Sequence, residues 1–151
     1  MKIRPIAIPT AIALATMFTA MPASSGTIVE TVAGWEIIKE DTACSIQLQY
    51  EGPGSSTLTF GKSVDLGIGV ILTNSNWTIK EESEIEVQYD LNDHIYAGTA
   101  TGLSLNGQRG FILFMEDDFE NHLRNGKSLR VYIGEKKIDQ LSLDGTTLAL
   151  A

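Results

Sequence analysis

Residues 85–91, with the sequence IEVQYDL, carry the clearest secondary-structure signal in this chain. Four apolar side chains in this segment alternate with Glu86, Gln88 and Asp90. Because successive side chains of a strand point to opposite faces of a sheet, the pattern predicts a strand with one face against a core and the other in water. Strands of this kind are typical of antiparallel sheets.

The same alternation recurs in four other segments, which are residues 46–50, 57–60, 129–133 and 140–144. Residues 68–72 and 111–114 are instead apolar on both faces, and this predicts central strands covered on both sides. Asn106-Gly107 precedes the second of these segments and predicts a hairpin, because both residues readily adopt positive φ. The other predicted turns lie at residues 51–54, 74–76 and 92–93.

One short helix is predicted over residues 117–125. The three carboxylates of residues 116–118 suit the positive end of a helix dipole and can cap free N–H groups. Phe119 and Leu123 share one helix face, and Gly126 is suited to end the helix.

Together these segments predict a mainly β fold. With 151 residues the chain has the length of one ordinary domain. We expect a single antiparallel β-sandwich-like domain of about eight strands with one short helix. A second helix is expected to begin at Thr146, near the end of the chain.

The first residues differ in composition from the rest. Lys2 and Arg4 precede an apolar run at residues 6–21, which ends in small and polar residues. This order is typical of a secretory signal peptide; the alternative is an uncleaved membrane anchor, but the run is short and interrupted for a span of ~20 residues. The sequence therefore predicts a signal peptide at residues 1–25 and one periplasmic or secreted β-rich domain at residues 26–151.

The chain is acidic, with a formal net charge of −8, and loss of Lys2 and Arg4 with the signal peptide makes it −10. Nucleic acids and anionic membranes are bound through clustered Lys and Arg, so neither is an expected partner. No stable membrane insertion is expected after signal cleavage. One cysteine and two histidines are too few for a Cys-rich or His-based metal site, and neither a metal nor a cofactor is predicted.

Two acidic clusters have structural explanations. Residues 116–120 are able to bind a cation in principle, but helix capping already accounts for them. Residues 90–94 resemble a calcium-binding loop superficially, but Ile95 stands where that loop needs Gly and Thr101 where it needs Glu. We therefore expect a loop between two strands there.

His94 and His122 are the candidates for a general base in an enzyme. A small exported hydrolase or lyase is the main alternative to a binding domain, with Asp90, Asp93 or Asp117 as the partner of one histidine. Both histidines are expected to be exposed, and nothing in the sequence places them together. The alternative requires an imidazole within hydrogen-bond reach of a carboxylate in a cleft, and no catalytic residue is assigned.

Three other features have functional interpretations. Cys44 shares the apolar face of the strand that follows it, which predicts a buried and unreactive thiol. Trp35 and Trp77 lie at strand ends next to turns, where they either border the core or contact a sugar or a protein. A protein inhibitor that presents the loop at residues 51–56 or 74–77 is a third class of function.

The C-terminal third contains two segments that resemble the end of small exported proteobacterial proteins. They are residues 119–131, FxxxLRxGKSLRV, and residues 138–150, IxxLSLxGxxxAL. The named group with this layout is the invasion-associated locus B family, and a larger set of uncharacterised exported proteins is similar, with an early Trp (here Trp35) and a Cys nine residues later (here Cys44). The resemblance implies a β-sandwich-like domain closed by a short helix, a strand pair and a terminal helix, and it implies no catalytic residues.

The chain departs from that family in its cysteine content. The locus B proteins carry cysteine pairs, whereas Cys44 is the only cysteine here, and their terminal helix normally continues beyond the position of Ala151. An oxidising compartment tends to pair thiols. We therefore hypothesise that the chain is short at its C-terminus and that Cys44 has lost its partner or forms an intermolecular disulfide, which thiol titration of the denatured protein would detect.

The sequence thus predicts an exported, non-enzymatic binding or accessory domain of the cell envelope. Its expected partner is another envelope or secreted protein. Trp35 and Trp77 are the candidate binding residues, and Cys44 is the candidate for an intermolecular or lost disulfide.

Overall fold

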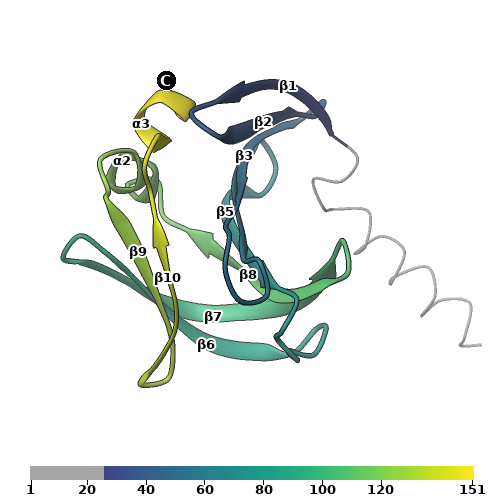
Figure 1. Ribbon diagram of the computed structural model, residues 1–151, viewed down its shortest axis with the longest axis vertical. Helices are drawn as coiled ribbons and strands as arrows, with labels where there is room; N and C mark the ends of the chain where they lie inside the picture. The colour runs from purple at the N-terminus through teal and green to yellow at the C-terminus, as the bar shows by residue number, and fades with distance from the viewer. Residues whose placement is uncertain (1–25) are drawn as a thin grey trace, which may run out of the picture.

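The computed structural model describes residues 26–151, which form one ten-stranded antiparallel sheet and two short helices (Figure 1). The predicted signal peptide at residues 1–25 lies outside the described residues. The strands are β1 (Thr27–Val32), β2 (Trp35–Lys39), β3 (Ala43–Gln49), β4 (Thr57–Ser63), β5 (Gly67–Asn74), β6 (Glu84–Leu91), β7 (His94–Leu105), β8 (Gln108–Met115), β9 (Ser128–Ile133) and β10 (Lys136–Ser142). Their order in the sheet is β1-β2-β3-β4-β5-β8-β7-β6-β9-β10. The predicted mainly β, antiparallel fold is confirmed, with ten strands instead of about eight.

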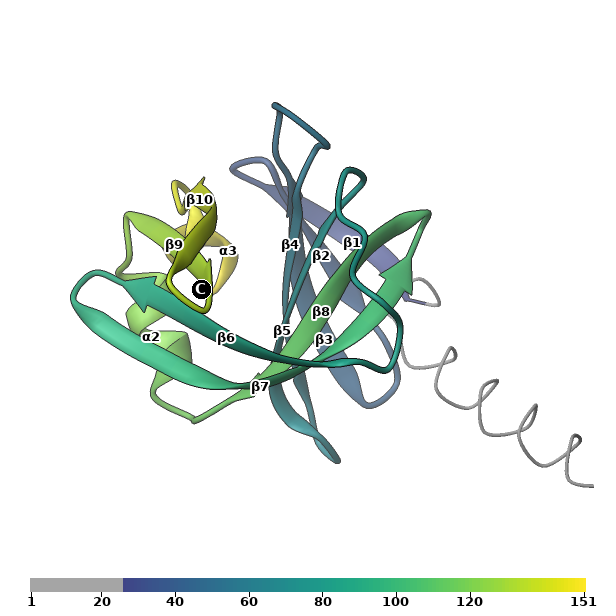
Figure 2. The ribbon, with the colours of Figure 1, turned by 90° about the horizontal axis from the view of Figure 1, so that it is seen from below.

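The sheet is strongly curved, and its two halves face each other across the core. β2 to β5 lie on one side of the molecule and β9 and β10 on the other, with β6 and β7 running between them (Figures 1 and 2). Hydrogen bonds join the facing halves: Trp35 Nε1 donates to the carbonyl oxygen of Asp144 at 3.0 Å. The hydroxyl of Tyr50 donates to the carbonyl oxygen of Ser142 at 2.6 Å. The segment that ends the sheet is therefore tied to the strands that begin it.

The concave side of the sheet holds the core. The alternating apolar side chains of β6 point into it, and Val87, Tyr89 and Leu91 are buried, as the sequence pattern predicts. The largest fully buried side chains are Trp35, Tyr89, Phe111, Phe119, Leu58, Leu72, Leu91, Leu123, Leu129, Leu143, Val70 and Val131. These residues come mainly from both halves of the sheet and from α2 (Phe119–Arg124), and they pack together into one hydrophobic core.

The predicted hairpin turns are confirmed. Asn106-Gly107 joins β7 to β8, and the turn at residues 92–93 joins β6 to β7. All four turn residues have positive φ, between 48° and 79°. Because such two-residue turns match the twist of the flanking strands, they set the register of both hairpins.

The two strands that are apolar on both faces, β5 and β8, are neighbours in the middle of the sheet, as predicted. The prediction that both their faces are covered is wrong. The side chain of Phe114 on the outer face of β8 is 52% exposed, and Ile71 and Ile112 beside it are only half-buried. The physical reason is that a single curved sheet fills only its concave side, and in the described chain no second layer covers the convex side.

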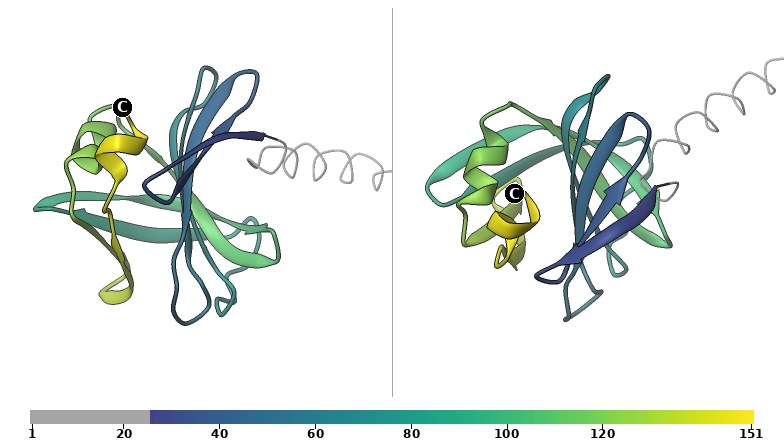
Figure 3. Two further views of the ribbon diagram at one scale, coloured as in Figure 1. Left: turned by 45° about the horizontal axis from the view of Figure 1, so that its top comes forward. Right: turned by 90° about the horizontal axis from the view of Figure 1, so that it is seen from above.

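The two helices close the open end of the sheet (Figure 3). They are α2 (Phe119–Arg124) and α3 (Thr146–Ala149), so a helix does begin at Thr146, while the first helix is shorter than residues 117–125. Asp118 occupies the N-cap position, but its side chain makes no capping hydrogen bond. Within the described part of the chain, no helix is long and apolar enough to cross a bilayer.

Gly126 follows α2 for a packing reason. Its φ is not positive, so it does not end the helix in the left-handed conformation that is common for a glycine at this position. A Cβ atom there would lie 2.8 Å from Leu91 Cδ1 and 2.9 Å from Leu143 Cδ1. The glycine therefore allows the chain to approach the core closely between two leucines.

Candidate functional site

The fold brings the two histidines together. His94 starts β7 and His122 lies on α2, and their rings stack with centroids 3.6 Å apart and planes 13° apart. The hydroxyl of Tyr96 is hydrogen-bonded to His122 Nδ1, and its ring packs edge-on against Phe119. The sequence did not indicate this cluster, because the residues are brought together by the packing of α2 on the first half of β7.

Two carboxylates stand beside this cluster. Asp118 Oδ2 lies 3.9 Å from His122 Nδ1, at the outer limit for an ion pair. The pKa of Tyr96 is raised, first by burial and then by the negative charges of Asp118 and Glu116. The protonated hydroxyl can serve as a hydrogen-bond donor.

The described residues show no hydrogen bond or ion pair between either histidine and Asp90, Asp93 or Asp117, the partners named for the hydrolase alternative. Among residues 26–151, no hydrogen bond joins either imidazole to a carboxylate, and His122 Nδ1 is occupied by Tyr96. Asp90, one of the candidate partners, forms an ion pair with Arg130 at 2.8 Å instead. The described residues also contain no group of three side chains able to hold a metal ion.

A polar cavity of about 360 Å³ lies next to Tyr96, between the first half of β7 and the end of β8. Its lining includes the carboxylate residues Glu116 and Asp118 and the apolar residues Ile95 and Phe114. No Lys or Arg is among the residues that line it. The cavity thus combines negative charge with an exposed apolar border.

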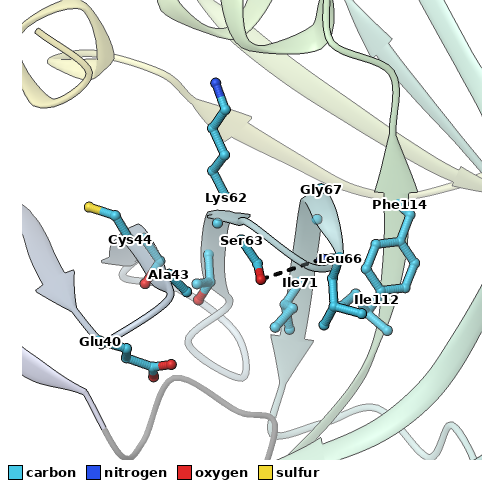
Figure 4. A pocket seen from close by; sticks show the side chains of 14 residues that line it. Glu40, Ala43, Cys44, Lys62, Ser63, Leu66, Gly67, Ile71, Ile112 and Phe114 are labelled. Carbon is cyan, nitrogen blue, oxygen red and sulfur yellow. Dashed lines mark hydrogen bonds between the residues drawn. The ribbon is translucent and has the colours of Figure 1, made fainter.

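An apolar groove of about 100 Å³ crosses the outer face of β3, β4, β5 and β8 (Figure 4). Figure 4 shows Leu66, Ile71, Ile112 and Phe114 gathered on one side of it, with Cys44 and Lys62 farther along. We call this feature the outer groove and define it by Gly61, Leu66, Gly69, Ile71, Ile112 and Phe114. Leu66 and Phe114 are 51% and 52% exposed, so the groove presents apolar surface to the solvent.

Two glycines form the floor of the outer groove. Gly61 on β4 and Gly69 on β5 are directly opposite each other in the register, and Gly69 is opposite Phe114 on β8. A Cβ atom at Gly69 would meet Ile112 Cδ1 at 3.5 Å, and one at Gly61 would meet Ser45 Cβ at 3.5 Å, which are ordinary contacts. The backbone therefore does not require glycine at either position, and their effect is to leave the floor of the groove open.

The predicted binding tryptophans lie elsewhere. Trp35 is 0% exposed and belongs to the core, so its ring has no surface to offer a ligand in this fold. Trp77 is half-buried and stacks on Phe111, with centroids 5.7 Å apart. A contact between Trp77 and a ligand stays a prediction.

The prediction of a buried Cys44 is wrong, because its thiol is exposed. Cys44 is the second residue of β3 and pairs with Lys62 on β4, at the rim where the apolar core has ended. Cys44 lies on the same face of β3 as the apolar residues that follow it. Its side chain is exposed because β3 extends beyond the edge of the core. An intermolecular disulfide through Cys44 stays a prediction that thiol titration tests.

The loops at residues 51–56 and 74–77 are bound to each other. Asn74 is 5% exposed, and its Nδ2 donates to the carbonyl oxygen of Pro53 at 3.0 Å and to Ser56 Oγ at 2.9 Å. The backbone N–H of Ser75 donates to the carbonyl oxygen of Gly54 at 2.9 Å. The two loops of the inhibitor alternative therefore form one hydrogen-bonded unit.

No family model matches the chain, and no curated protein matches its sequence. Among solved structures, it is similar to the crystal structure of invasion associated protein B from Bartonella henselae. The TM-score is 0.60 with 15% sequence identity, over 82% of this chain and 94% of that chain. At this identity the likeness concerns the fold alone, and it agrees with the resemblance that the C-terminal segments indicate. The chain therefore has a fold similar to that of invasion associated protein B.

Proposed function

We propose that this chain is an exported, non-enzymatic binding or accessory domain of the cell envelope, periplasmic or secreted. It binds another envelope or secreted protein, and the outer groove is the site of contact. The signal-peptide pattern of residues 1–25 supports export.

The exposed apolar surface of the outer groove is the observation that carries this proposal. In an ordinary sheet with one solvated face, the outer positions are polar. Here Ile71, Ile112 and Phe114 are apolar at outer positions in the middle of the sheet, and Leu66 stands beside them. Contiguous exposed apolar surface of this kind is typical of sites that bind proteins or apolar ligands.

The groove can be filled without disturbing the backbone, which gives a direct test. In Gly69→Val, two methyl groups occupy the floor of the groove next to Phe114, at a position where φ is negative. Leu148→Ser is the matched control, because Leu148 is an exposed apolar residue on α3 that does not line the outer groove.

The experiment is affinity capture from envelope extracts with the purified protein and with both variants, quantified by mass spectrometry. We expect a protein that is captured by the wild type and by Leu148→Ser and is reduced at least about tenfold with Gly69→Val, equivalent to about 1.4 kcal/mol. Equal capture by all three proteins would remove the groove as the site. Absence of any specifically captured protein would contradict a binding function.

Export is tested separately by expressing the full chain in bacterial cells and fractionating them. We expect the protein in the periplasm or the medium, with a mass reduced by loss of its N-terminal segment. Full-length protein in the cytoplasm would contradict the proposed export.

A further inference from the structure

The sheet splits between β7 and β8. β7 pairs with β6 along its length from His94 to Thr101, but it pairs with β8 only from Thr101 to Leu105. The last residues of β8, up to Met115, continue along β5 and leave β7. Figure 2 shows the two strands diverging beyond this point. The first half of β7 therefore has a neighbouring strand on one side only.

Alternation of the backbone hydrogen bonds shows which groups are free at this split. In a two-residue hairpin the residues that flank the turn form a hydrogen-bonded pair, here Leu91 and His94. Every second residue from His94 thus directs its N–H and C=O groups to β6, and the residues between direct theirs away from it. The latter residues are Ile95, Ala97 and Thr99. By the same alternation, the N–H and C=O groups of Thr101 also point away from β6. Thr101 is the residue at which pairing with β8 is observed to begin, which agrees with this assignment.

These groups open on the polar cavity described above, which Ile95, Ala97 and Phe114 line. Among the described residues, no turn, loop or cap hydrogen bond involves the backbone of Ile95, Ala97 or Thr99. Six backbone donors and acceptors along the first half of β7 thus form none of these hydrogen bonds, and they have the spacing that an added strand needs.

The other two edges of the described sheet differ from this one. β1 carries a β-bulge between Ile28 and Glu30, and β10 carries one between Lys137 and Asp139. Bulges and charged residues on an edge strand prevent pairing with another chain. The pairing of β6 with β7 is regular over eight residues, and residues 94–100 contain no Lys, Arg, Pro, Asp or Glu. The edge of β7 along residues 94–100 thus has neither a bulge nor a charged side chain.

The surroundings indicate what kind of strand fits. Ile95 is 63% exposed and lies with Phe114 on the outer face, where apolar side chains of an added strand would pack. Glu116 and Asp118 also line the cavity, and neither forms an ion pair with Lys or Arg among the described residues. Because side chains of a strand alternate between faces, the complementary sequence alternates apolar and basic residues.

We propose that β7 accepts an extended segment of a partner protein, in which basic and apolar residues alternate, as an additional strand at the split between β7 and β8. This proposal rests on the proposed function and names the binding mode: Phe114 borders both the cavity and the outer groove, so one partner covers both. The backbone of the segment pairs with Ile95, Ala97 and Thr99, and its Lys or Arg side chains meet Glu116 and Asp118.

The test uses two six-residue peptides as probes, KVKVKV and EVEVEV, and measures amide hydrogen exchange of the purified protein by NMR. We expect KVKVKV to slow the exchange of the amides of Ile95, Ala97 and Thr99, and EVEVEV to bind at least about tenfold more weakly. No protection of these amides at a saturating concentration of KVKVKV would overturn the proposal, as would equal affinity for both peptides.

A backbone variant tests the added hydrogen bonds directly. Ala97→Pro removes an N–H that points into the split and does not belong to the ladder with β6, so the fold is expected to persist. Ala97→Val is the matched control that keeps the N–H. We expect at least about tenfold weaker binding of KVKVKV to Ala97→Pro than to Ala97→Val. Equal binding by the two variants contradicts strand addition, and the exchange measurement on the unmodified protein decides the question if Ala97→Pro fails to fold.

The same variants separate this inference from the proposed function. If capture from envelope extracts is lost with Gly69→Val but is unchanged with Ala97→Pro, the outer groove is the binding site and strand addition is refuted. If both substitutions abolish capture while Leu148→Ser and Ala97→Val preserve it, the partner occupies the groove and the edge together.

Discussion

The hydroxyls of Tyr50 and Tyr89 differ in burial and in hydrogen bonding. Tyr50 donates to the carbonyl oxygen of Ser142, whereas the hydroxyl of the fully buried Tyr89 has no hydrogen-bond partner in the described part of the chain. A buried hydroxyl without a partner opposes folding, since it loses its hydrogen bonds to water. The sequence identifies both tyrosines as inward-facing members of an alternating pattern, but their partners depend on what lies across the core.

Tyr89→Phe is therefore expected to raise the free energy of unfolding by about 1 kcal/mol, and Tyr50→Phe to lower it by about 1 kcal/mol. The two changes remove the same atom, once from a hydroxyl with a hydrogen-bond partner and once from a buried hydroxyl without one. Urea denaturation of the two variants and the wild type checks this. A loss of stability in Tyr89→Phe would mean that its hydroxyl has a partner, such as a bound water molecule.

The same residues make stability depend on alkaline pH. Burial raises the pKa of Tyr89, and burial together with the charges of Asp139 and Asp144 raises the pKa of Tyr50. In the unfolded chain both titrate near pH ~10, so above that pH the folded state holds more protons, and stability falls as pH rises. Urea midpoints between about pH 8 and 11 should decline less in Tyr89→Phe than in the wild type. Equal declines would show that Tyr89 does not contribute.

At the scale of single elements, burial decides which strands a sequence pattern reveals. β6 was predicted because its alternating side chains lie between water and the core. β1 was missed because nearly all of its side chains are exposed. Neither face of this strand lies against the core, so its sequence does not need to alternate polar and apolar residues. The first half of β7 was missed because Gly98 and Ala100 on its inner face interrupt the apolar alternation, and a Cβ atom on Gly98 would lie 3.1 Å from Leu113 Cδ1.

Glycines of the two central strands should respond differently to substitution. A Cβ atom at Gly110 on β8 would lie 1.9 Å from the carbonyl oxygen of Leu72, whereas at Gly69 on β5 the nearest atom would be 3.5 Å away. We expect Gly110→Ala to lower the free energy of unfolding by about 3 kcal/mol and Gly69→Ala to change it by no more than about 0.5 kcal/mol. Thermal denaturation of both variants measures this, and similar melting temperatures would contradict the close strand approach at Gly110.

At the scale of the whole molecule, the curvature of the sheet brings its first and last strands together. Trp35 on β2 is the centre of this contact, because its indole donates to the carbonyl oxygen of Asp144 and its ring belongs to the core. Gly145 packs against the same region, where a Cβ atom would meet Ala33 Cβ at 2.7 Å. The C-terminal segment therefore contributes to the stability of strands more than a hundred residues earlier.

Trp35→Phe should weaken this closure. It removes the hydrogen bond to Asp144 and leaves a cavity beside α3, and we expect a loss of about 2–3 kcal/mol in the free energy of unfolding. Trp77→Phe is the control, because Trp77 is half-buried and phenylalanine preserves a ring contact with Phe111. Denaturation curves of the two variants provide the comparison. An equal effect of both substitutions would argue against a special role of Trp35 in joining the ends of the sheet.

The polar and apolar pattern predicts the antiparallel β class and most of the strands. Turn-forming and capping residues add the turns at residues 92–93 and 106–107 and the two helices, because all of these depend on neighbours along the chain. The pattern also identified β5 and β8 as central strands. The exposed groove on these strands, the stacked histidines and the unpaired edge of β7 depend on strand order and curvature. These properties arise from contacts between distant residues, and for that reason the two features on which binding is proposed became visible only in the folded molecule.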